Sequence, residues 1–536
     1  MSDNESNGRA LESWLYTGWR RVSPQERWAF LACFVSGLLI HLYAFTNLIP
    51  NADGISRLYD TQEMTISGRW FLHYISALNC YLEMPALIGV LSLLFLALAA
   101  AVMVKLLRVR GCIWSALIGV SLAAFPSVAY TYLYMFTASA YFFGVFLAVL
   151  GVTLASRGKW GFLWGAIPLA FAVGIYQAYL SFAIGLCLIL VLLSALENTR
   201  PWKEVFLQGL RYVAFLAAGM LLYFIILKIF LAVKNLQLLS YLGMSSTAGS
   251  YPLAQLPRIL ARTYKGFAEY FFLGTSTKYT TLASAILHTL LALFVIWLFF
   301  RLIRRNKVSR GNSVIAVCMG VLLPLGLNFA QVLSPYSTPT PIMKFAFVLV
   351  YVFVLTMIDR CPDASDKLLK WGRCAGFAMM VAALFYCWQI DNVVYSASDT
   401  AMRATENFCS RLVERIESTD GYKDGMEVLI IGSYPTDRYY SDIDAYDQVQ
   451  HYSCDADSTI ALNKQIYYFI DRWLNVPIKE PAEQDFIDMA DTFDFKMMPR
   501  YPDDGCTQVI DGKLVVKLQK KYTPKQDYEI QYENRR

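Results

Sequence analysis

The sequence predicts an all-α membrane protein of about eleven transmembrane helices, followed by a small α/β domain. Three observations predict this class. The composition is 56% hydrophobic and only 16% charged, whereas a soluble globular protein is about 45–50% apolar and about 25% charged. Long apolar runs recur through the first 390 residues, and the sign of the net charge reverses after them. The composition therefore excludes a single soluble enzyme.

About eleven apolar runs are long enough to cross the ~30 Å hydrocarbon core of a bilayer, which takes roughly 20 helical residues. The first begins at Ser23-Pro24-Gln25-Glu26, a capping box with proline at the first helical position. It is too long for a signal peptide and lacks a small-residue cleavage site, so we expect it to remain as a span. The runs are 27–49, 85–107, 112–129, 138–156, 160–176, 178–196, 211–233, 280–303, 313–333, 341–358 and 371–390.

The orientation follows from the loops between these runs. Lys and Arg gather in alternate short loops, such as 105–110, 157–159 and 301–310, while the opposite short loops near 130–137 and 334–340 carry none. Cytoplasmic loops are enriched in these residues. The N-terminus is therefore predicted in the cytoplasm, and the C-terminal part on the other side of the membrane.

The charge divides the chain near residue 390. Residues 391–536 hold 17 Lys and Arg against 27 Asp and Glu, a net −10, which leaves +16 for the rest of a chain whose net charge is +6. We predict a cytoplasmic segment 1–26, a polytopic membrane domain 27–390 with outer loops at about 50–84 and 234–279, and an extracytoplasmic soluble domain 391–536.

The C-terminal part has the pattern of a small α/β domain. Helical patterns at 399–418, 459–474 and 481–492 accompany a buried-type strand at 428–431. Two further strands, 506–510 and 513–518, flank Asp511-Gly512, which predicts a type I′ hairpin. Cys454 and Cys506 both lie in this part, where they either form a disulfide or remain free.

Few carboxylates remain as candidates for acid–base chemistry. Residues 1–390 hold only 14 Asp and Glu, and the predicted orientation puts most of them on the cytoplasmic side. None of those on the outer side lies in the middle of a predicted span, where carboxylates of ion-coupled transporters usually lie. This distribution favours an enzyme over a transporter. The outer carboxylates are Asp53, Asp60, Glu63, Glu83 and Glu269.

Several segments resemble a known family. They are Asn51-Ala52-Asp53 just after the first run, Gly68-Arg69-Trp70-Phe71 later in the same loop, the aromatic segment 125–134, the turn Gly174-Ile175-Tyr176-Gln177-Ala178 between two runs, and the tail segment 411–432. Together they resemble the polytopic glucosyltransferases of the Gtr type II family, which modify O-antigen and related surface polysaccharides. The resemblance covers nearly the whole chain. One departure is Gly54, where many relatives are expected to carry a second acid.

The resemblance implies a glycosyltransferase of the GT-C type in the bacterial cytoplasmic (inner) membrane. Such an enzyme moves a hexose, here glucose, from a polyprenyl-phosphate donor to an extracytoplasmic surface glycan. The alternatives are a polymerase or ligase of lipid-linked glycans, or a flippase of lipid-linked sugar without chemistry. No cofactor and no nucleic-acid partner are expected, since the sequence has no nucleotide-binding motif or metal-ligand cluster. Dependence on a divalent metal stays open.

Two acids are the candidate catalytic residues. Glycosyl transfer to a hydroxyl group needs a carboxylate that accepts its proton. We predict Asp53 as this base, with Asp60 as the second candidate or as an orienting partner. If 53–64 is helical, both lie on one face with Arg57 between them. The alternative is that one acid caps a loop helix or pairs with Arg57.

Cations are needed for the phosphate that leaves, and the resemblance and residue types together indicate which. Arg69 is the first candidate, because a guanidinium group binds two phosphate oxygens at once; its alternative is a salt bridge within the loop. Arg57 and Lys344 are further candidates, although Lys344 equally suits a side chain that reaches the headgroups. Arg262 lies in an amphipathic stretch, 255–272, that also suits plain headgroup binding.

Four residues complete the predicted site as sugar-binding side chains. Tyr176 and Gln177 occupy a short exterior turn, where they either bind a sugar or satisfy the helix ends. Trp70 offers an aromatic face and Glu63 a carboxylate in the loop that carries both candidate bases.

Overall fold

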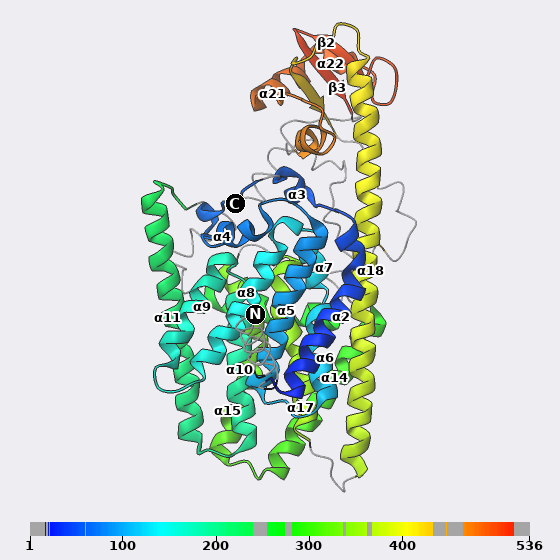
Figure 1. The fold of residues 1–536 in the computed structure, drawn as a ribbon. Helices are drawn as coiled ribbons and strands as arrows, with labels where there is room; N and C mark the ends of the chain where they lie inside the picture. The colour runs from blue at the N-terminus through cyan, green and yellow to red at the C-terminus, as the bar shows by residue number, and fades with distance from the viewer. Residues whose placement is uncertain are drawn as a thin grey trace, which may run out of the picture.

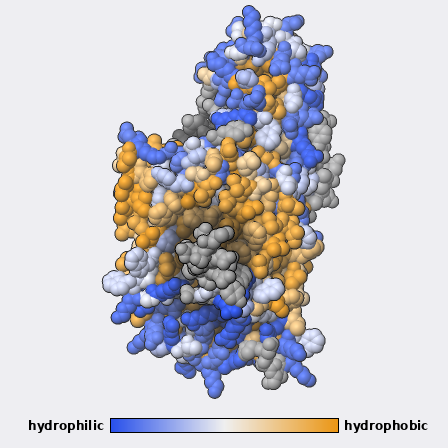
Figure 2. All heavy atoms as spheres, viewed as in Figure 1, coloured by the Kyte–Doolittle hydropathy of each residue, from blue (hydrophilic) through white to orange (hydrophobic). Residues whose placement is uncertain are grey.

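The computed structural model describes residues 17, 20, 22–58, 60–238, 255–273, 281–335, 339–361, 367–432, 446 and 465–518. Within these residues the chain is predominantly helical, and nine helices are long and apolar enough to cross a membrane. Two shorter apolar helices accompany them. The long helices lie side by side in a bundle (Figure 1). Figure 2 shows a hydrophobic band across the visible face of the bundle between two hydrophilic ends, as expected for a multi-pass membrane protein.

Each of the eleven predicted runs coincides with one of these helices. The two shorter ones are α6 (Cys112–Ala124) and α9 (Gly161–Ile175). The number of helices that cross the bilayer stays a prediction. The others are α2 (Pro24–Thr46), α5 (Pro85–Leu107), α8 (Met135–Ala155), α10 (Tyr179–Glu197), α11 (Trp202–Val233), α14 (Leu282–Arg305), α15 (Arg310–Leu327), the 3₁₀ helix η5 (Pro341–Phe347) continued by α17 (Val348–Asp359), and α18 (Lys367–Glu417).

Short elements join the long helices. The loop between α2 and α5 contains α3 (Ala52–Ser56), η1 (Thr65–Ser67), α4 (Leu72–Ser76) and η2 (Ala77–Asn79). Elsewhere lie α7 (Ser127–Tyr132), α13 (Leu256–Ala268), the π-helix η4 (Glu269–Leu273) and α16 (Phe329–Leu333). The predicted capping box at the start of α2 is confirmed: the Ser23 hydroxyl accepts from the Glu26 amide, and the Glu26 carboxylate accepts from the Ser23 amide.

The last long helix, α18, is continuous across the predicted domain boundary. It has 51 residues, so its axis is about 77 Å long. Beyond residue 390 it still packs against α2, where the Tyr395 hydroxyl and His41 Nδ1 lie 2.7 Å apart. Asp391, assigned from the sequence to the soluble tail, is fully buried here. No break in the helix marks the boundary at 390, since amphipathic residues follow the apolar run in helical phase.

Beyond α18 lies a three-stranded sheet with the order β1-β3-β2. Strand β1 (Val428–Ile431) is parallel to β3 (Lys513–Lys517), which is antiparallel to β2 (Thr507–Ile510). Asp511 and Gly512 connect β2 to β3 with positive φ values of 48° and 74°, the geometry of a type I′ turn. Helices in this region are α20 (Gln465–Tyr468), the π-helix η8 (Phe469–Trp473), α21 (Glu483–Asp491) and α22 (Phe493–Met497).

The structure does not test the predicted disulfide between Cys454 and Cys506. Cys454 lies outside the described residues, and Cys506 is buried beside the sheet.

Candidate active site

The loop between α2 and α5 begins with the short helix α3, which carries Asp53. Asn51 caps this helix: its side-chain oxygen accepts from the Gly54 amide at 2.8 Å. A Cβ at Gly54 would lie 2.9 Å from the Pro50 Cβ, so this cap leaves no space for the second acid expected there. The helix ends at Ser56. The helix postulated over 53–64 is therefore absent, and Asp60 does not share a helix face with Asp53.

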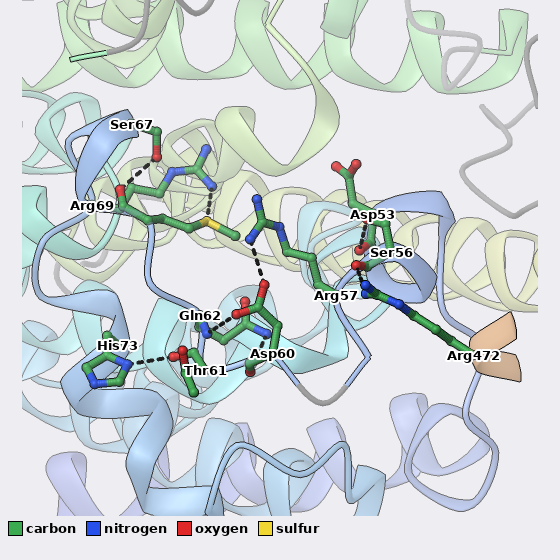
Figure 3. A network of polar contacts seen from close by, with 11 residues as sticks. Asp53, Ser56, Arg57, Asp60, Thr61, Gln62, Ser67, Arg69, His73 and Arg472 are labelled. Atoms are coloured by element: carbon green, nitrogen blue, oxygen red, sulfur yellow. Dashed lines mark hydrogen bonds and ion pairs between the residues drawn. The ribbon is translucent and has the colours of Figure 1, made fainter. Parts of the chain in front are cut away.

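The Asp53 carboxylate is exposed, and among the described residues it makes no hydrogen bond or ion pair. The surrounding protein nevertheless desolvates it, which raises its pKa. The positive charges of Arg57 and Arg69 act against this rise. In Figure 3 the Asp53 carboxylate and both guanidinium groups point to the same side of the loop. The oxygens of the Asp53 carboxylate are thus available to a substrate, and two cations act on them.

Asp60 is held by its neighbours. One carboxylate oxygen accepts from Arg57 Nη1 at 3.0 Å, and the other accepts from the Gln62 amide at 3.0 Å. The Gln62 side chain donates back to the Asp60 carbonyl. This is the alternative considered from the sequence, in which one acid pairs with Arg57. The contacts assign Asp60 to shaping the loop and orienting Arg57.

Arg69 lies among aromatic side chains. Its Nη1 donates to the Tyr141 hydroxyl at 3.1 Å, and its guanidinium carbon lies 4.9 Å from the centre of the Tyr176 ring. The two tyrosines stack on each other with ring centres 4.6 Å apart. Contacts of this kind stabilise a guanidinium group and fix its direction. Arg69 is therefore held on an aromatic platform to which Tyr176, a predicted sugar ligand, contributes.

Hydrogen bonds join the turn before Arg69 to α11 and to the turn between α9 and α10. The Gln177 side chain donates to the Ser67 carbonyl at 2.8 Å, and the Tyr223 hydroxyl donates to the Gly68 carbonyl at 3.0 Å. Gln177 also donates to Tyr223. Gln177 thus satisfies backbone groups, the alternative considered from the sequence. Tyr223 was missed by sequence reasoning because nothing distinguishes it from the other aromatic residues of an apolar run.

The segment Gly68–Phe71 and the turn Gly174–Ala178, both singled out in the sequence, contact each other directly. The Phe71 amide donates to the Gly174 carbonyl at 2.9 Å. Gly174 also makes space for Trp70, because a Cβ there would lie 2.6 Å from the indole ring. Trp70 is only 3% exposed and packs against Phe171 and Phe230. Its contacts are those of a packing residue that anchors the Arg69 turn.

The remaining predicted ligands lie elsewhere. Glu63 forms an ion pair with Lys234 at the end of α11, which lowers the pKa of Glu63. Lys344 on η5 is buried, with its ammonium group 5.8 Å from the centre of the Tyr270 ring. Arg262 on α13 donates to the Pro335 carbonyl at 2.9 Å. The segment between α2 and α5, here called the α3 loop, therefore carries Asp53, Arg57, Asp60 and Arg69, whereas Lys344 and Arg262 contact Tyr270 and Pro335 instead.

Comparison with known families identifies the chain. Residues 42–357 match the family described as glucosyl transferase GtrII. This segment is more than half of the 536 residues. The chain belongs to the GtrII glucosyltransferase family. The predicted resemblance is thereby confirmed, and the chain is assigned as a membrane glycosyltransferase. No curated protein sequence matches it significantly.

The family match places the α3 loop, the Arg69 turn and the Gly174 turn of this GtrII protein inside the segment shared with its relatives. It ends at residue 357, within α17. Helix α18 and the sheet that follows are outside the matched segment, so the family assignment says nothing of their role.

One contact nevertheless joins the C-terminal part of the GtrII chain to the candidate site. Arg472 on η8 donates to the Ser56 carbonyl at the end of α3 (Figure 3), and α3 packs against both α20 and η8. A guanidinium group at the carboxyl end of a helix satisfies backbone oxygens that the helix leaves unpaired. Sequence reasoning missed Arg472 because its partner is 416 residues away.

No group of three or more His, Cys, Asp or Glu side chains in the described part of the GtrII chain is placed to hold a metal ion.

Substitution of Gly174 by Ala tests the packing between the two motifs of the GtrII chain. We expect Gly174→Ala to lower the free energy of unfolding by about 1–3 kcal/mol, because the new methyl group overlaps the buried indole of Trp70. Transfer activity should fall as well, because a displaced Trp70 displaces Arg69, the residue before it in the chain. Thermal unfolding in detergent measures the first effect. The control is Gly209→Ala in α11, where the nearest atoms are 3.9 Å away; equal losses for both variants would contradict the assignment.

A second prediction concerns Glu83, just before α5. Glu83 is buried, and neither carboxylate oxygen has a partner among the described residues. Burial raises the pKa of Glu83 from 4.5 to about 8. The folded state therefore binds this proton more tightly than the unfolded state, so the stabilisation is complete below about pH 4.5 and is lost as pH rises through about 8.

We accordingly expect the melting temperature to fall between about pH 5 and pH 9, and Glu83→Gln to remove most of that fall. Thermal unfolding in detergent at several pH values measures it. Glu63→Gln is the control, because the pKa of Glu63 is lowered and its contribution is lost on the acid side instead. The assignment fails if Glu83→Gln leaves the alkaline slope unchanged.

Proposed function

We propose that this chain transfers glucose from a polyprenyl-phosphate donor to a surface glycan at the extracytoplasmic face of the bacterial inner membrane. The family assignment supports a glucosyltransferase. The observation that carries the proposal is the arrangement of the α3 loop. There the available Asp53 carboxylate interacts electrostatically with Arg57 and Arg69. A proton acceptor beside cations is the combination that transfer from a phosphate requires.

In the proposed reaction the acceptor hydroxyl gives its proton to Asp53 while its oxygen forms a bond to the anomeric carbon of glucose. The bond between that carbon and the phosphate oxygen breaks, and polyprenyl phosphate leaves with the electron pair. Arg57 and Arg69 stabilise the negative charge of the leaving phosphate. General-base catalysis of this kind contributes about 10²–10⁴ to the rate. The leaving phosphate is stable as an anion, so the reaction needs no general acid.

The proposal includes a topology of the GT-C type. About eleven spans, a cytoplasmic N-terminus and an extracytoplasmic C-terminal domain place the α3 loop on the outer side, with the basic loops inside. Cysteines introduced at exposed positions of the C-terminal part test this orientation. Labelling of intact cells by a membrane-impermeant reagent is expected, and labelling only after lysis would overturn it.

The test of function uses the full-length protein in phospholipid vesicles with polyprenyl-phospho-glucose, labelled in the sugar, and an acceptor polysaccharide. We expect label in the polysaccharide, and the same assay with EDTA measures whether transfer depends on a divalent metal. Vesicles with a nucleotide-activated glucose donor are the control and should give no product. Label that crosses the bilayer while still on the lipid would instead identify a flippase, and lengthened polysaccharide chains a polymerase.

A further inference from the structure

A basic pocket lies at the end of the bundle opposite the α3 loop. Its volume is about 440 Å³, and it lies where α5, α8 and α10 end and α11 begins. Its lining includes only two carboxylates, Glu197 and Glu204. The cations that line it are Lys105, Arg108, Arg157, Arg200, Arg211 and Arg360.

Most of these cations have no partner of opposite charge. Lys105 pairs with Glu26, and Arg360 pairs with Glu197 and also donates to the Leu107 carbonyl. The other four arginines form no ion pair among the described residues. Burial and the neighbouring Arg110 and Arg108 lower the pKa of Arg360 to about 10, as expected where positive charge accumulates. Unlike the basic loops at this end in general, these side chains come from five separate segments and converge on one cavity.

The position of the pocket favours a ligand that comes from the bilayer. Leu207 lines the pocket and is 52% exposed on α11. Its helix neighbours Phe206 and Leu210 are also exposed. An apolar surface of this kind suits acyl chains. Neutral donors such as Ser156, Thr199 and Gln208 complete the pocket's polar lining.

We propose that this pocket binds the phosphate-bearing headgroup of an anionic phospholipid. The arginines bind phosphate oxygens in pairs, and the acyl chains lie along the exposed face of α11. Basic pockets between helices at the cytoplasmic side of membrane proteins recognise such headgroups. The site is separate from the α3 loop, and the proposal does not depend on the proposed reaction.

Lipid retention tests this site. The full-length protein is exchanged into zwitterionic phosphatidylcholine containing a small fraction of diphosphatidylglycerol, and bound lipid is counted by native mass spectrometry. The pocket variant carries Arg108→Gln, Arg157→Gln and Arg211→Gln. The matched control carries Arg304→Gln, Arg305→Gln and Arg310→Gln, three arginines at the connection between α14 and α15 that are exposed like those of the pocket variant but do not line the pocket.

A phosphate contact by one arginine is worth on the order of fivefold in affinity, so we expect the pocket variant to retain at least about tenfold less lipid. The control should change less than about twofold. Equal loss in both variants, or no loss in either, would overturn the proposal. If the pocket variant elutes as an aggregate, Arg157→Gln alone replaces it, with an expected loss of about fivefold.

A second arm separates a lipid headgroup from free phosphate. Thermal unfolding is measured in pure phosphatidylcholine with increasing inorganic phosphate or with increasing diphosphatidylglycerol. We expect the lipid to raise the melting temperature of the wild type but not of the pocket variant, with inorganic phosphate having no effect. A shift caused by inorganic phosphate and lost in the pocket variant would mean a soluble ligand and would overturn the assignment to a lipid.

Discussion

The variant Asp53→Asn should transfer glucose about 10²–10⁴-fold more slowly than the wild type, because a general base contributes a factor of this size to the rate. The carboxylate is exposed, and no described residue hydrogen-bonds it, so Asn changes little besides the ability to accept a proton. The polyprenyl-phospho-glucose assay in vesicles measures the rate, and KM for the donor should change little. A rate within about threefold of the wild type, in a protein that unfolds at the normal temperature, would remove Asp53 from the mechanism.

Asp60→Asn is the matched comparison. This change weakens the ion pair with Arg57 and leaves the acceptor for the Gln62 amide in place. We therefore expect a loss of about tenfold or less, seen more in KM for the donor than in the limiting rate. If Asp60→Asn is the more damaging substitution, the roles of the two acids are reversed.

The pH dependence gives an independent check on Asp53. A base must be ionised, so the rate falls as pH drops through its pKa. Desolvation raises the pKa of Asp53 by more than Arg57 and Arg69 lower it, so the net direction is upward. The acid limb of kcat/KM should therefore lie above the ordinary aspartate value of about 3.9. It should move to higher pH in Arg57→Gln, because that variant loses a charge that favours the ionised form.

The second large effect is expected for Arg69. Arg69→Gln should lower the transfer rate by about 10²–10³, the usual cost of removing one group that stabilises developing negative charge. Arg69→Lys should restore only part of it, since an ammonium group keeps the charge but not the planar contacts with Tyr141 and Tyr176. The same vesicle assay measures both variants.

Lys234→Gln is the control for Arg69, because Lys234 is a cation bound to the same loop through Glu63. It should leave the rate within about threefold of the wild type. Arg69 has no role in the departure of phosphate if Arg69→Gln and Lys234→Gln behave alike.

The long helices could be predicted from the sequence because each one leaves a run of about 20 apolar residues, a purely local signal. The capping box before α2 is local for the same reason. The extent of α18 could not be predicted this way. Past residue 390 polar residues interrupt the apolar run, and only packing against His41 and α2 shows that Asp391 is buried.

The candidate site likewise has some features that the local sequence indicates and others that depend on contacts between distant residues. Composition and the predicted orientation together restricted the base to a few carboxylates, and the family resemblance and residue type together indicated Arg69. Which carboxylate is available depends on where α3 ends, since that places Asp60 rather than Asp53 against Arg57. The support for Arg69 comes from residues such as Tyr141 and Tyr223, which belong to distant helices. No local pattern carries that information.

The length of α18 sets a distance between the sheet and the membrane surface. At most about 30 Å of its axis lies in hydrocarbon, and a straight helix does not shorten under thermal motion. Arg472 holds the lower side of the same region on α3. The continuous helix and the Arg472 contact together join the sheet to the helical bundle at two places (Figure 1). Removing roughly two turns of α18 would bring the sheet about 10 Å closer to the bilayer, too far for Arg472 to keep its hold on α3.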